Sequence, residues 1–446
     1  MGRLFGTDGV RGVANRDLTG DLAFRLGRAA VIALTERGES RPGIVVGRDP
    51  RASGEFLEAA LAAGVCSAGG DALLAGVCTT PGVAFLTADL GVEAGAVVSA
   101  SHNPAEYNGI KFFDATGYKL PDAVEDQMES IVDDDRVPRP EGRGVGRILR
   151  VPDATERYLT HLEEAAGEHA LAGMRVVVDC AHGAASGVAP ELLRRIGAEV
   201  IPINDEPDGW NINDGVGAMC PEVVGMAVAE ADADAGVAHD GDADRAIFAD
   251  RDGNIVDGDH VLAACALAMK DEGRLDGDLV VTTVMTNMGF RLRMEEAGIC
   301  VVETKVGDRY VLEEMLRTGA VLGGEQSGHV IFRRHATTGD GLLTAVQFLG
   351  LANRKGQSVS ELASWMTKLP QVLLNVEVAD LDGLEPSPRV WEAVRAAEAD
   401  LGKEGRVLVR ASGTEPLVRV MVEGPTEQIA RAHAERIAGV VRATLA

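Results

Sequence analysis

A serine, a histidine and an Asn-Pro pair follow an apolar run between residues 95 and 104. The run Gly-Ala-Val-Val at 95–98 is typical of a buried strand, and Ser101 comes three residues after it. Because Asn103-Pro104 predicts a turn, Ser101 is expected at the mouth of a loop where a ligand can reach it. The Gly-x-Ser-x-Gly elbow of serine hydrolases is absent here. Taken alone, the pattern more often marks a serine that caps a turn.

Three aspartates, Asp240, Asp242 and Asp244, occupy alternate positions. In an extended backbone alternate side chains point the same way, so the three carboxylates converge. A divalent cation relieves their repulsion, and a ligand set made only of oxygen favours magnesium over zinc. An EF-hand is excluded because Arg245 and Arg251 stand where that loop requires Gly and Glu. A solvated acidic loop is the alternative, since the whole chain is acidic.

A glycine-rich polar loop at 323–329 separates two apolar runs, 320–322 and 330–332. Its Glu325 and Ser327 are suited to accept from and donate to pairs of sugar hydroxyls. His329 can transfer a proton near neutral pH. An ordinary hairpin loop explains this pattern as well.

A second glycine loop, at 410–416, has arginine on both sides. Arg410 precedes Ser412, Gly413 and Thr414, and Arg419 follows in the next expected strand. Guanidinium groups, hydroxyls and backbone amides together form a cradle for phosphate. A capping loop is the alternative. With the other three segments, this loop indicates phosphoryl transfer on a sugar phosphate.

The charge of the chain excludes some partners. A formal net charge of −26 over 446 residues argues against nucleic acid and anionic membranes. A sugar phosphate is also an anion, so its binding requires local positive potential. The candidate cations are Arg11, Arg48, Lys111, Arg245, Lys305, Arg410 and Arg419.

The cysteines indicate a reducing compartment. Six cysteines, at 66, 78, 180, 220, 265 and 300, are scattered without a Cys-x-x-Cys pair. Most have apolar neighbours, which predicts buried free thiols and a cytoplasmic protein. No signal peptide or membrane span is visible in the sequence.

The length fits about three domains by the usual size prior. Strand, polar loop and amphipathic helix succeed one another in three segments. The expected pairs are 44–46 with 56–63, 176–178 with 192–196, and 279–281 with 290–297. The final segment instead has an alternating strand at 372–378 and a helix over about 426–446. Residues 133–142, acidic and then rich in Pro and Gly, read as a linker.

With these segments in order, the chain resembles the alpha-D-phosphohexomutase superfamily. The resemblance extends from Phe-Gly-Thr-Asp-Gly-Val-Arg-Gly at 5–12 to the last strand. It includes Gly-Arg-Asp-Pro-Arg at 47–51, the serine loop, Asn-Gly-Ile-Lys at 108–111, the triple aspartate and both glycine loops. Glu-Gln-Ser-Gly-His at 325–329 and Val-Gly-Asp-Arg-Tyr at 306–310 resemble the glucosamine branch.

The resemblance implies an α/β fold: three similar α/β domains and a smaller C-terminal α+β domain around a central active-site cleft. The implied domains are 1–147 with a phosphoserine loop, 148–255 with a metal-binding aspartate loop, 256–369 with a sugar-binding loop and 370–446 with a phosphate-binding loop.

The resemblance also implies the chemistry. Phosphorylated Ser101 exchanges its phosphoryl group with a hexosamine phosphate through a bound 1,6-bisphosphate, which also serves as activator. Ser101, Asp240, Asp242 and Asp244 hold one Mg²⁺. The substrate contacts Glu325, Ser327, Arg245, Lys305 and the phosphate cradle of Arg410, Ser412, Gly413, Thr414 and Arg419.

The implied catalytic set is Ser101, His102, Lys111, Arg11 and His329, and the general base remains open among His102, Lys111 and His329. Lys111 could act as a base only if nearby cations lowered its pKa. A phosphomannomutase or phosphoglucomutase shares every catalytic part. A phosphatase and a non-catalytic sugar-phosphate-binding protein are further alternatives. A homodimer is compatible with the sequence.

Overall fold

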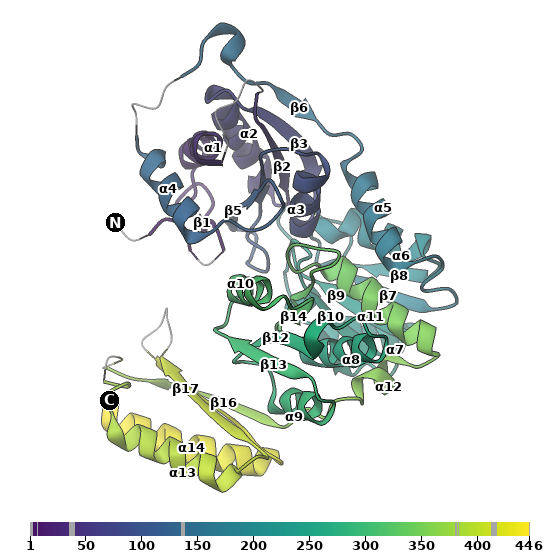
Figure 1. Ribbon diagram of the computed structural model, residues 1–446, viewed down its shortest axis with the longest axis vertical. Helices are drawn as coiled ribbons and strands as arrows, with labels where there is room; N and C mark the ends of the chain where they lie inside the picture. The colour runs from purple at the N-terminus through teal and green to yellow at the C-terminus, as the bar shows by residue number, and fades with distance from the viewer. Residues whose placement is uncertain are drawn as a thin grey trace. The chain divides into compact units, whose positions relative to one another are not determined.

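The computed structural model describes residues 3–6, 8–34, 41–134, 139–379, 381, 383–411 and 417–445 (Figure 1). The chain divides into two compact units. The first comprises Met1–Met285 with Ile299–Trp365, and the second Thr286–Gly298 with Met366–Ala446.

The first unit begins with a six-stranded sheet of order β1-β5-β4-β2-β3-β6. Its elements are β1 (Val10–Val13), α1 (Gly20–Leu34), β2 (Gly43–Arg48), α2 (Ala52–Ser67), β3 (Asp71–Val77), α3 (Thr80–Asp89), β4 (Ala94–Val98), β5 (Tyr107–Asp114), α4 (Asp122–Val132) and β6 (Ile148–Arg150). Apolar residues cover both faces of this sheet, because Ile44 and Val46 belong to one hydrophobic cluster and Val45 to another. Alternate side chains of β2 therefore face opposite helical layers.

Two further sheets complete the first unit. A five-stranded sheet has the order β11-β10-β9-β7-β8, and a four-stranded sheet has the order β13-β12-β14-β15. The elements around the former are α5 (Ala154–Ala166), β7 (Arg175–Asp179), α6 (Ala189–Arg195), β8 (Glu199–Ile203), α7 (Glu222–Ala231), β9 (Ala235–His239), β10 (Ala246–Asp250) and β11 (Ile255–Val256). Those around the latter are α8 (Gly258–Asp271), β12 (Leu279–Thr283), β13 (Cys300–Thr304), α10 (Asp308–Thr318), β14 (Leu322–Gly324), β15 (Val330–Phe332), α11 (Gly341–Lys355) and α12 (Val359–Ala363). The described residues also include the 3-10 turns η1 (Gly142–Gly144), η2 (Ala184–Gly187), η3 (Gly217–Met219) and η4 (Asp276–Asp278).

The three sheets share one topology. In each, a central strand (β2, β7 or β12) pairs in parallel with the next strand on one side and with the following strand on the other. That last strand then forms an antiparallel hairpin, β4–β5, β9–β10 or β14–β15. The loops of these hairpins are 99–106, 240–245 and 325–329. The serine, aspartate and sugar loops therefore occupy equivalent positions in three similar domains.

The second unit is a three-stranded antiparallel sheet, β16-β18-β17, with helices. Its elements are α9 (Met288–Glu296), β16 (Gln371–Glu377), α13 (Pro388–Leu401), β17 (Arg406–Ala411), β18 (Leu417–Glu423) and α14 (Glu427–Leu445). Buried residues of the sheet, α13 and α14 form one cluster. The predicted fold class, three α/β domains and a smaller α+β domain, is confirmed.

The four domain boundaries remain a prediction. Helix α9, expected in the third domain, groups with the second unit, where Glu423 accepts hydrogen bonds from Asn287 and from the backbone of Met288. The predicted linker at 133–142 lies partly outside the described residues, which omit 135–138.

All six cysteines are free, and Cys78, Cys180 and Cys265 are buried as predicted, whereas Cys300 is exposed. Within the described parts of the chain, no helix combines the length and the apolar character needed to cross a membrane.

Candidate active site

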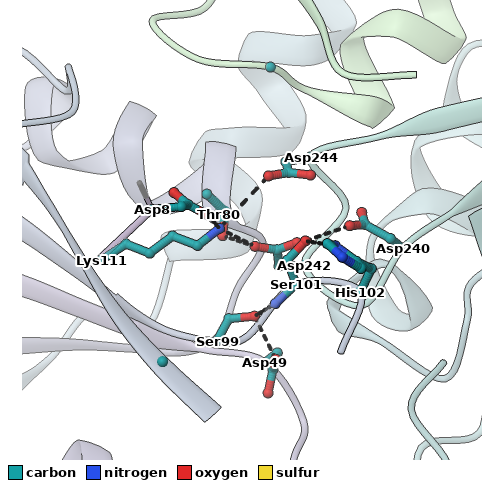
Figure 2. A network of polar contacts seen from close by, with 12 residues as sticks. Asp8, Asp49, Thr80, Ser99, Ser101, His102, Lys111, Asp240, Asp242 and Asp244 are labelled. Carbon is teal, nitrogen blue, oxygen red and sulfur yellow. Dashed lines mark hydrogen bonds and ion pairs between the residues drawn. The ribbon is translucent and has the colours of Figure 1, made fainter. Parts of the chain in front are cut away.

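Hairpin loops from the first two domains meet at Ser101 (Figure 2). The Ser101 side chain is buried, and its Oγ donates a 2.8 Å hydrogen bond to Asp240 Oδ2. His102 Nδ1 lies 3.3 Å from the same Oγ. The predicted serine and aspartate loops are thus in direct contact, although 139 residues separate the two side chains.

The aspartate triad has the properties of a cation site. Asp240, Asp242 and Asp244 are buried, and one carboxylate oxygen of each lies within 4.8 Å of the others. The Oδ1 atom of each has no hydrogen-bond partner among the described residues. Burial and repulsion from Asp244 and Asp242 raise the pKa of Asp240 to about 8. Three oxygens without donors and a carboxylate that resists ionisation fit a hard divalent cation.

Lys111 on β5 neutralises part of this negative charge. Its Nζ lies 2.9 Å from Asp8 Oδ2, 2.9 Å from Asp242 Oδ2 and 3.8 Å from Asp244 Oδ2. Burial acts to lower the pKa of Lys111, but the three carboxylates outweigh it and raise the pKa above its ordinary value. These three carboxylates therefore favour the charged form of Lys111.

The two candidate histidines differ in their surroundings. Burial, with Arg245 and Arg11 nearby, lowers the pKa of His102 to about 4. For His329, burial acts in the same direction, but Asp244 outweighs it and raises the pKa. His329 Nδ1 lies 3.6 Å from Asp244 Oδ2. His102 is therefore neutral and next to Ser101, whereas His329 lies beside the triad with Nε2 accepting from the Gly339 N–H at 3.1 Å, which requires that this nitrogen carry no proton.

Two arginines border the same group of residues. Arg11 pairs with Asp8, and Arg245 Nε lies 3.9 Å from Asp240 Oδ2 and 3.8 Å from Asp244 Oδ1. Both side chains are half-buried. Fixed positive charge therefore surrounds the serine and the triad, as an anionic substrate requires.

The sugar loop packs directly behind the aspartate loop. The backbone N–H of Ala246 donates to Gly328 O at 3.1 Å. Ser327 Oγ is buried without a hydrogen-bond partner in the described chain, and Glu325 Oε1 accepts from the Gly307 N–H at 3.0 Å. Lys305 is exposed. A donor without a partner on this loop is consistent with a ligand hydroxyl as its partner.

In the second unit, Arg410 and Arg419 stand directly opposite each other on β17 and β18. Burial and the charge of Arg419 lower the pKa of Arg410. Like charges opposed across a sheet destabilise it unless an anion lies between them. The cradle residues Ser412, Gly413 and Thr414 lie outside the described residues.

Several residues of this site were not predicted from the sequence. Asp8 contacts Arg11, Lys111 and Lys119. Thr80 Oγ1 donates to Asp242 Oδ2 at 2.6 Å. Asp8 lies in the 5–12 motif and could have been found there, whereas no sequence signal distinguishes Thr80.

Comparisons with known proteins agree with this geometry. Family models of phosphoglucomutase/phosphomannomutase match α/β/α domain I at residues 2–138, domain II at 156–253, domain III at 257–369 and the C-terminal domain at 373–440. The phosphoglucosamine mutase of Symbiobacterium thermophilum is 55% identical over 448 residues, with 100% of each chain covered. That of Thermobifida fusca is 54% identical over 444 residues, with 99% of this chain and 98% of the relative covered.

Solved structures share the fold. A phosphoglucomutase/phosphomannomutase family protein from Burkholderia thailandensis superposes with a TM-score of 0.82 at 24% identity, covering 99% of this chain and 97% of that one. An Aspergillus fumigatus N-acetylphosphoglucosamine mutase, in complex with GlcNAc-6P and magnesium, gives 0.67 at 19% identity, covering 99% and 96%. Because the identity to relatives exceeds half over the whole length, the chain belongs to the phosphoglucosamine mutases of the alpha-D-phosphohexomutase superfamily.

Proposed function

We propose that this protein interconverts glucosamine 6-phosphate and glucosamine 1-phosphate through a phosphoryl group carried on Ser101. The observation that carries the proposal is the contact between Ser101 Oγ and a buried aspartate triad whose three Oδ1 atoms have no hydrogen-bond partner in the described chain. A serine beside such a triad is placed for metal-assisted phosphoryl transfer. The names of the relatives supply the sugar.

The proposed metal is one Mg²⁺. Asp240, Asp242 and Asp244, with an oxygen on Ser101, would hold it, and it would neutralise the carboxylates and polarise the phosphoryl oxygens. The Aspergillus fumigatus relative, solved with GlcNAc-6P and magnesium, supports this choice.

The proposed reaction has two balanced half-reactions. In the first, the bond from phosphorus to Ser101 Oγ breaks while a bond to the free substrate hydroxyl forms; the hydroxyl proton passes to a base, and Ser101 Oγ takes up a proton as it leaves. The resulting 1,6-bisphosphate turns around. Ser101 Oγ loses its proton and bonds to the other phosphorus, while the bond from that phosphorus to the sugar oxygen breaks and the sugar oxygen takes up a proton. The same 1,6-bisphosphate, added in trace, charges Ser101 initially.

Charge and distance divide the work among the neighbouring residues. His102, neutral and 3.3 Å from Oγ, is proposed to accept the Ser101 proton when Oγ attacks the bisphosphate in the second half-reaction. Lys111, Arg11 and Arg245 stabilise the negative charge of the transition state as fixed cations. His329 is proposed to orient Asp244.

Glu325 and Ser327 are proposed to bind sugar hydroxyls, Lys305 to attract the anionic substrate, and Arg410 and Arg419, with Ser412, Gly413 and Thr414, to hold the non-reacting phosphate. The six free cysteines fit a reducing cytoplasm as the location.

Phosphorus NMR tests the proposal. Purified protein receives Mg²⁺ and the 6-phosphate of glucosamine, glucose or mannose, with a trace of the matching 1,6-bisphosphate. Fastest formation of glucosamine 1-phosphate is expected, and Ser101→Ala should abolish it while the protein stays folded. A preference for glucose or mannose would reject the sugar assignment, and release of inorganic phosphate alone would identify a phosphatase.

A further inference from the structure

Arg51 is a fully buried arginine that is absent from the set of residues assigned to the chemistry. It lies between β2 and α2, and its side chain has 0% relative exposure. A buried guanidinium requires partners for all of its N–H groups. Its partners explain the shape of the serine loop.

Four of the five N–H groups of the Arg51 guanidinium donate to backbone carbonyls of the serine loop, residues 99–106, and of Tyr107 directly after it. Ser101, the central residue of this loop, is labelled in Figure 2. Nη2 donates to Ser101 O at 3.0 Å and to Asn103 O at 2.8 Å. Nη1 donates to Tyr107 O at 3.1 Å and to Pro104 O. One rigid fork therefore fixes four carbonyls between residues 101 and 107.

Asp49 connects the same guanidinium to the nitrogen of Ser101. Its Oδ2 accepts from Arg51 Nε at 2.8 Å and from Ser99 Oγ at 2.6 Å. Ser99 Oγ in turn accepts from the Ser101 N–H at 3.0 Å. The amide nitrogen of Ser101 is thus connected to Arg51 through Ser99 and Asp49, and its carbonyl oxygen accepts from Arg51 directly. Figure 2 shows the contacts of Ser99 with Asp49 and with Ser101.

The backbone of Ser101 needs this support. Its φ of +53° is left-handed, a conformation that is unfavourable for a residue with a Cβ. Asn213, in the second domain, adds a second clamp: its Nδ2 donates to Ser101 O at 2.9 Å and to Asn103 O at 3.0 Å. Surroundings that determine a strained residue this fully are typical of sites where geometry matters for function.

We propose that Arg51 is a positioning residue for phosphoryl transfer: it shapes the 101–107 backbone so that Ser101 Oγ meets the aspartate loop identically in both half-reactions. Asn213 carries the same constraint from the second domain. Neither residue contacts the reacting atoms. The inference rests on the proposed function, since it assigns these residues to the turnover of Ser101.

The main test is Arg51→Ala in the full-length protein, assayed for turnover of glucosamine 6-phosphate. We expect kcat to fall by roughly 10²-fold with KM unchanged, because misplacement of a reacting group by about 1 Å has that effect. Millimolar guanidinium chloride should restore kcat, and equal sodium chloride should not. The phosphorus resonance of phosphorylated Ser101 should shift in the variant and return with guanidinium. Provided that the wild type is active, two results overturn the inference. One is an unchanged kcat in Arg51→Ala, and the other is a lowered kcat that guanidinium does not restore.

Milder variants keep the test decisive if Arg51→Ala does not fold. Ser99→Ala and Asn213→Ala each remove one clamp and should lower kcat without raising KM. Thr87→Val is the matched control, since Thr87 Oγ1 is equally buried but donates to Val83 O within α3. If kcat of Ser99→Ala and Asn213→Ala stays at the wild-type value, as it should in Thr87→Val, the inference is rejected. A wild-type protein that fails to turn over any of the sugar phosphates rejects the proposed function instead.

Discussion

Thr80 fixes the orientation of one aspartate in the triad. Its hydroxyl and Lys111 Nζ both donate to Asp242 Oδ2, at 2.6 and 2.9 Å. With Oδ2 satisfied by two donors, Oδ1 is the oxygen left available to a cation. The Thr80 N–H also donates to Asp242 O at 3.0 Å, so the first residue of α3 holds this aspartate at both ends.

Replacement of Thr80 by valine should therefore weaken metal binding. Loss of a group that orients a metal ligand typically costs about 10- to 100-fold in affinity, so Thr80→Val should raise the Mg²⁺ concentration for half-maximal turnover by about 10-fold. A Mg²⁺ titration of the mutase rate measures this. Thr87→Val serves again as control, and an unchanged Mg²⁺ requirement in Thr80→Val would contradict the assigned role.

Arg419 makes a separate prediction for substrate binding. If Arg419 and Arg410 hold the non-reacting phosphate, Arg419→Ala removes a charge-assisted hydrogen bond of roughly 1.5–3 kcal/mol. KM for glucosamine 6-phosphate should rise by about 10- to 100-fold. The salt dependence of kcat/KM should also weaken. Unchanged kinetics would show that the cradle is misplaced.

Residues with a local pattern could be predicted from the sequence, and residues without one could not. The alternation of Asp240, Asp242 and Asp244 is visible within five positions, and the structure does bring the three carboxylates together. The contact of Thr80 with Asp242 spans 162 positions and uses a hydroxyl that threonines everywhere possess. The contact forms only when the first two domains pack together, so the sequence around either residue does not predict it.

At the scale of elements, the sequence predicted that particular apolar runs form strands, but it did not predict the first and last residues of those strands. The apolar run at 320–322 was expected to end before the glycines, but β14 is Leu322–Gly324. Its register explains the shift: Gly323 and Gly324 pair with Ile331 and Val330 across the hairpin. A Cβ on Gly324 would lie 2.5 Å from His329 O, so the tight hairpin needs glycine there.

Helix α11 begins with a buried carboxylate that should make stability depend on pH. Asp340 Oδ1 accepts from the Leu343 N–H at 2.9 Å, and Oδ2 accepts from Tyr158 Oη at 2.8 Å. Burial raises the pKa of Asp340 to about 6, despite these hydrogen bonds. A folded-state pKa above the unfolded one means that this contribution to stability is full at low pH and is lost as pH rises through about 6.

Asp340→Asn should remove this dependence. Asparagine caps a helix as well as aspartate does, so the variant should match the wild type below about pH 4, where the carboxyl is protonated in both the folded and the unfolded chain. At pH 8 it should be more stable, by at most roughly 3 kcal/mol, because about two pKa units separate the folded and unfolded carboxyl. Urea unfolding of both proteins at several pH values measures the difference. A difference that stays constant with pH would contradict the assignment.

At the scale of the whole first unit, the 306–310 motif joins two domains. The sequence associated Val-Gly-Asp-Arg-Tyr with choice of sugar, yet Asp308 pairs with Lys119 and Arg309 with Glu125, both from the first domain. Arg309 Nη2 also donates to Leu120 O at 2.7 Å. Ion pairs between domains depend on their packing, which explains why the sequence alone could not assign these residues.

The Arg309 pair should stabilise the unit far more than a surface pair does. The side chains of Arg309 and Glu125 are each 9% exposed, whereas the Arg317 and Glu314 pair on the same helix includes an arginine that is 70% exposed. Removal of one partner from a buried pair costs roughly 3–5 kcal/mol when the remaining charge has no other partner, against about 0–1 kcal/mol for a surface pair. The cost here should lie between these limits, because Arg3 Nη2 also lies 3.2 Å from Glu125 Oε2. Arg309→Met should therefore lower the urea midpoint markedly, and Arg317→Met should not.

A double variant separates the two parts of that cost. In Arg309→Met with Glu125→Gln the buried carboxylate, which keeps only Arg3 as a partner, is replaced by a neutral amide, so part of the lost stability should return. If the double variant were as unstable as Arg309→Met, packing of the Arg309 stem against the first domain would be the dominant contribution. If Arg309→Met itself matched Arg317→Met, the motif would not hold the domains together. The motif would then act in substrate recognition instead, since its Gly307 N–H donates to Glu325, one of the proposed sugar-binding residues.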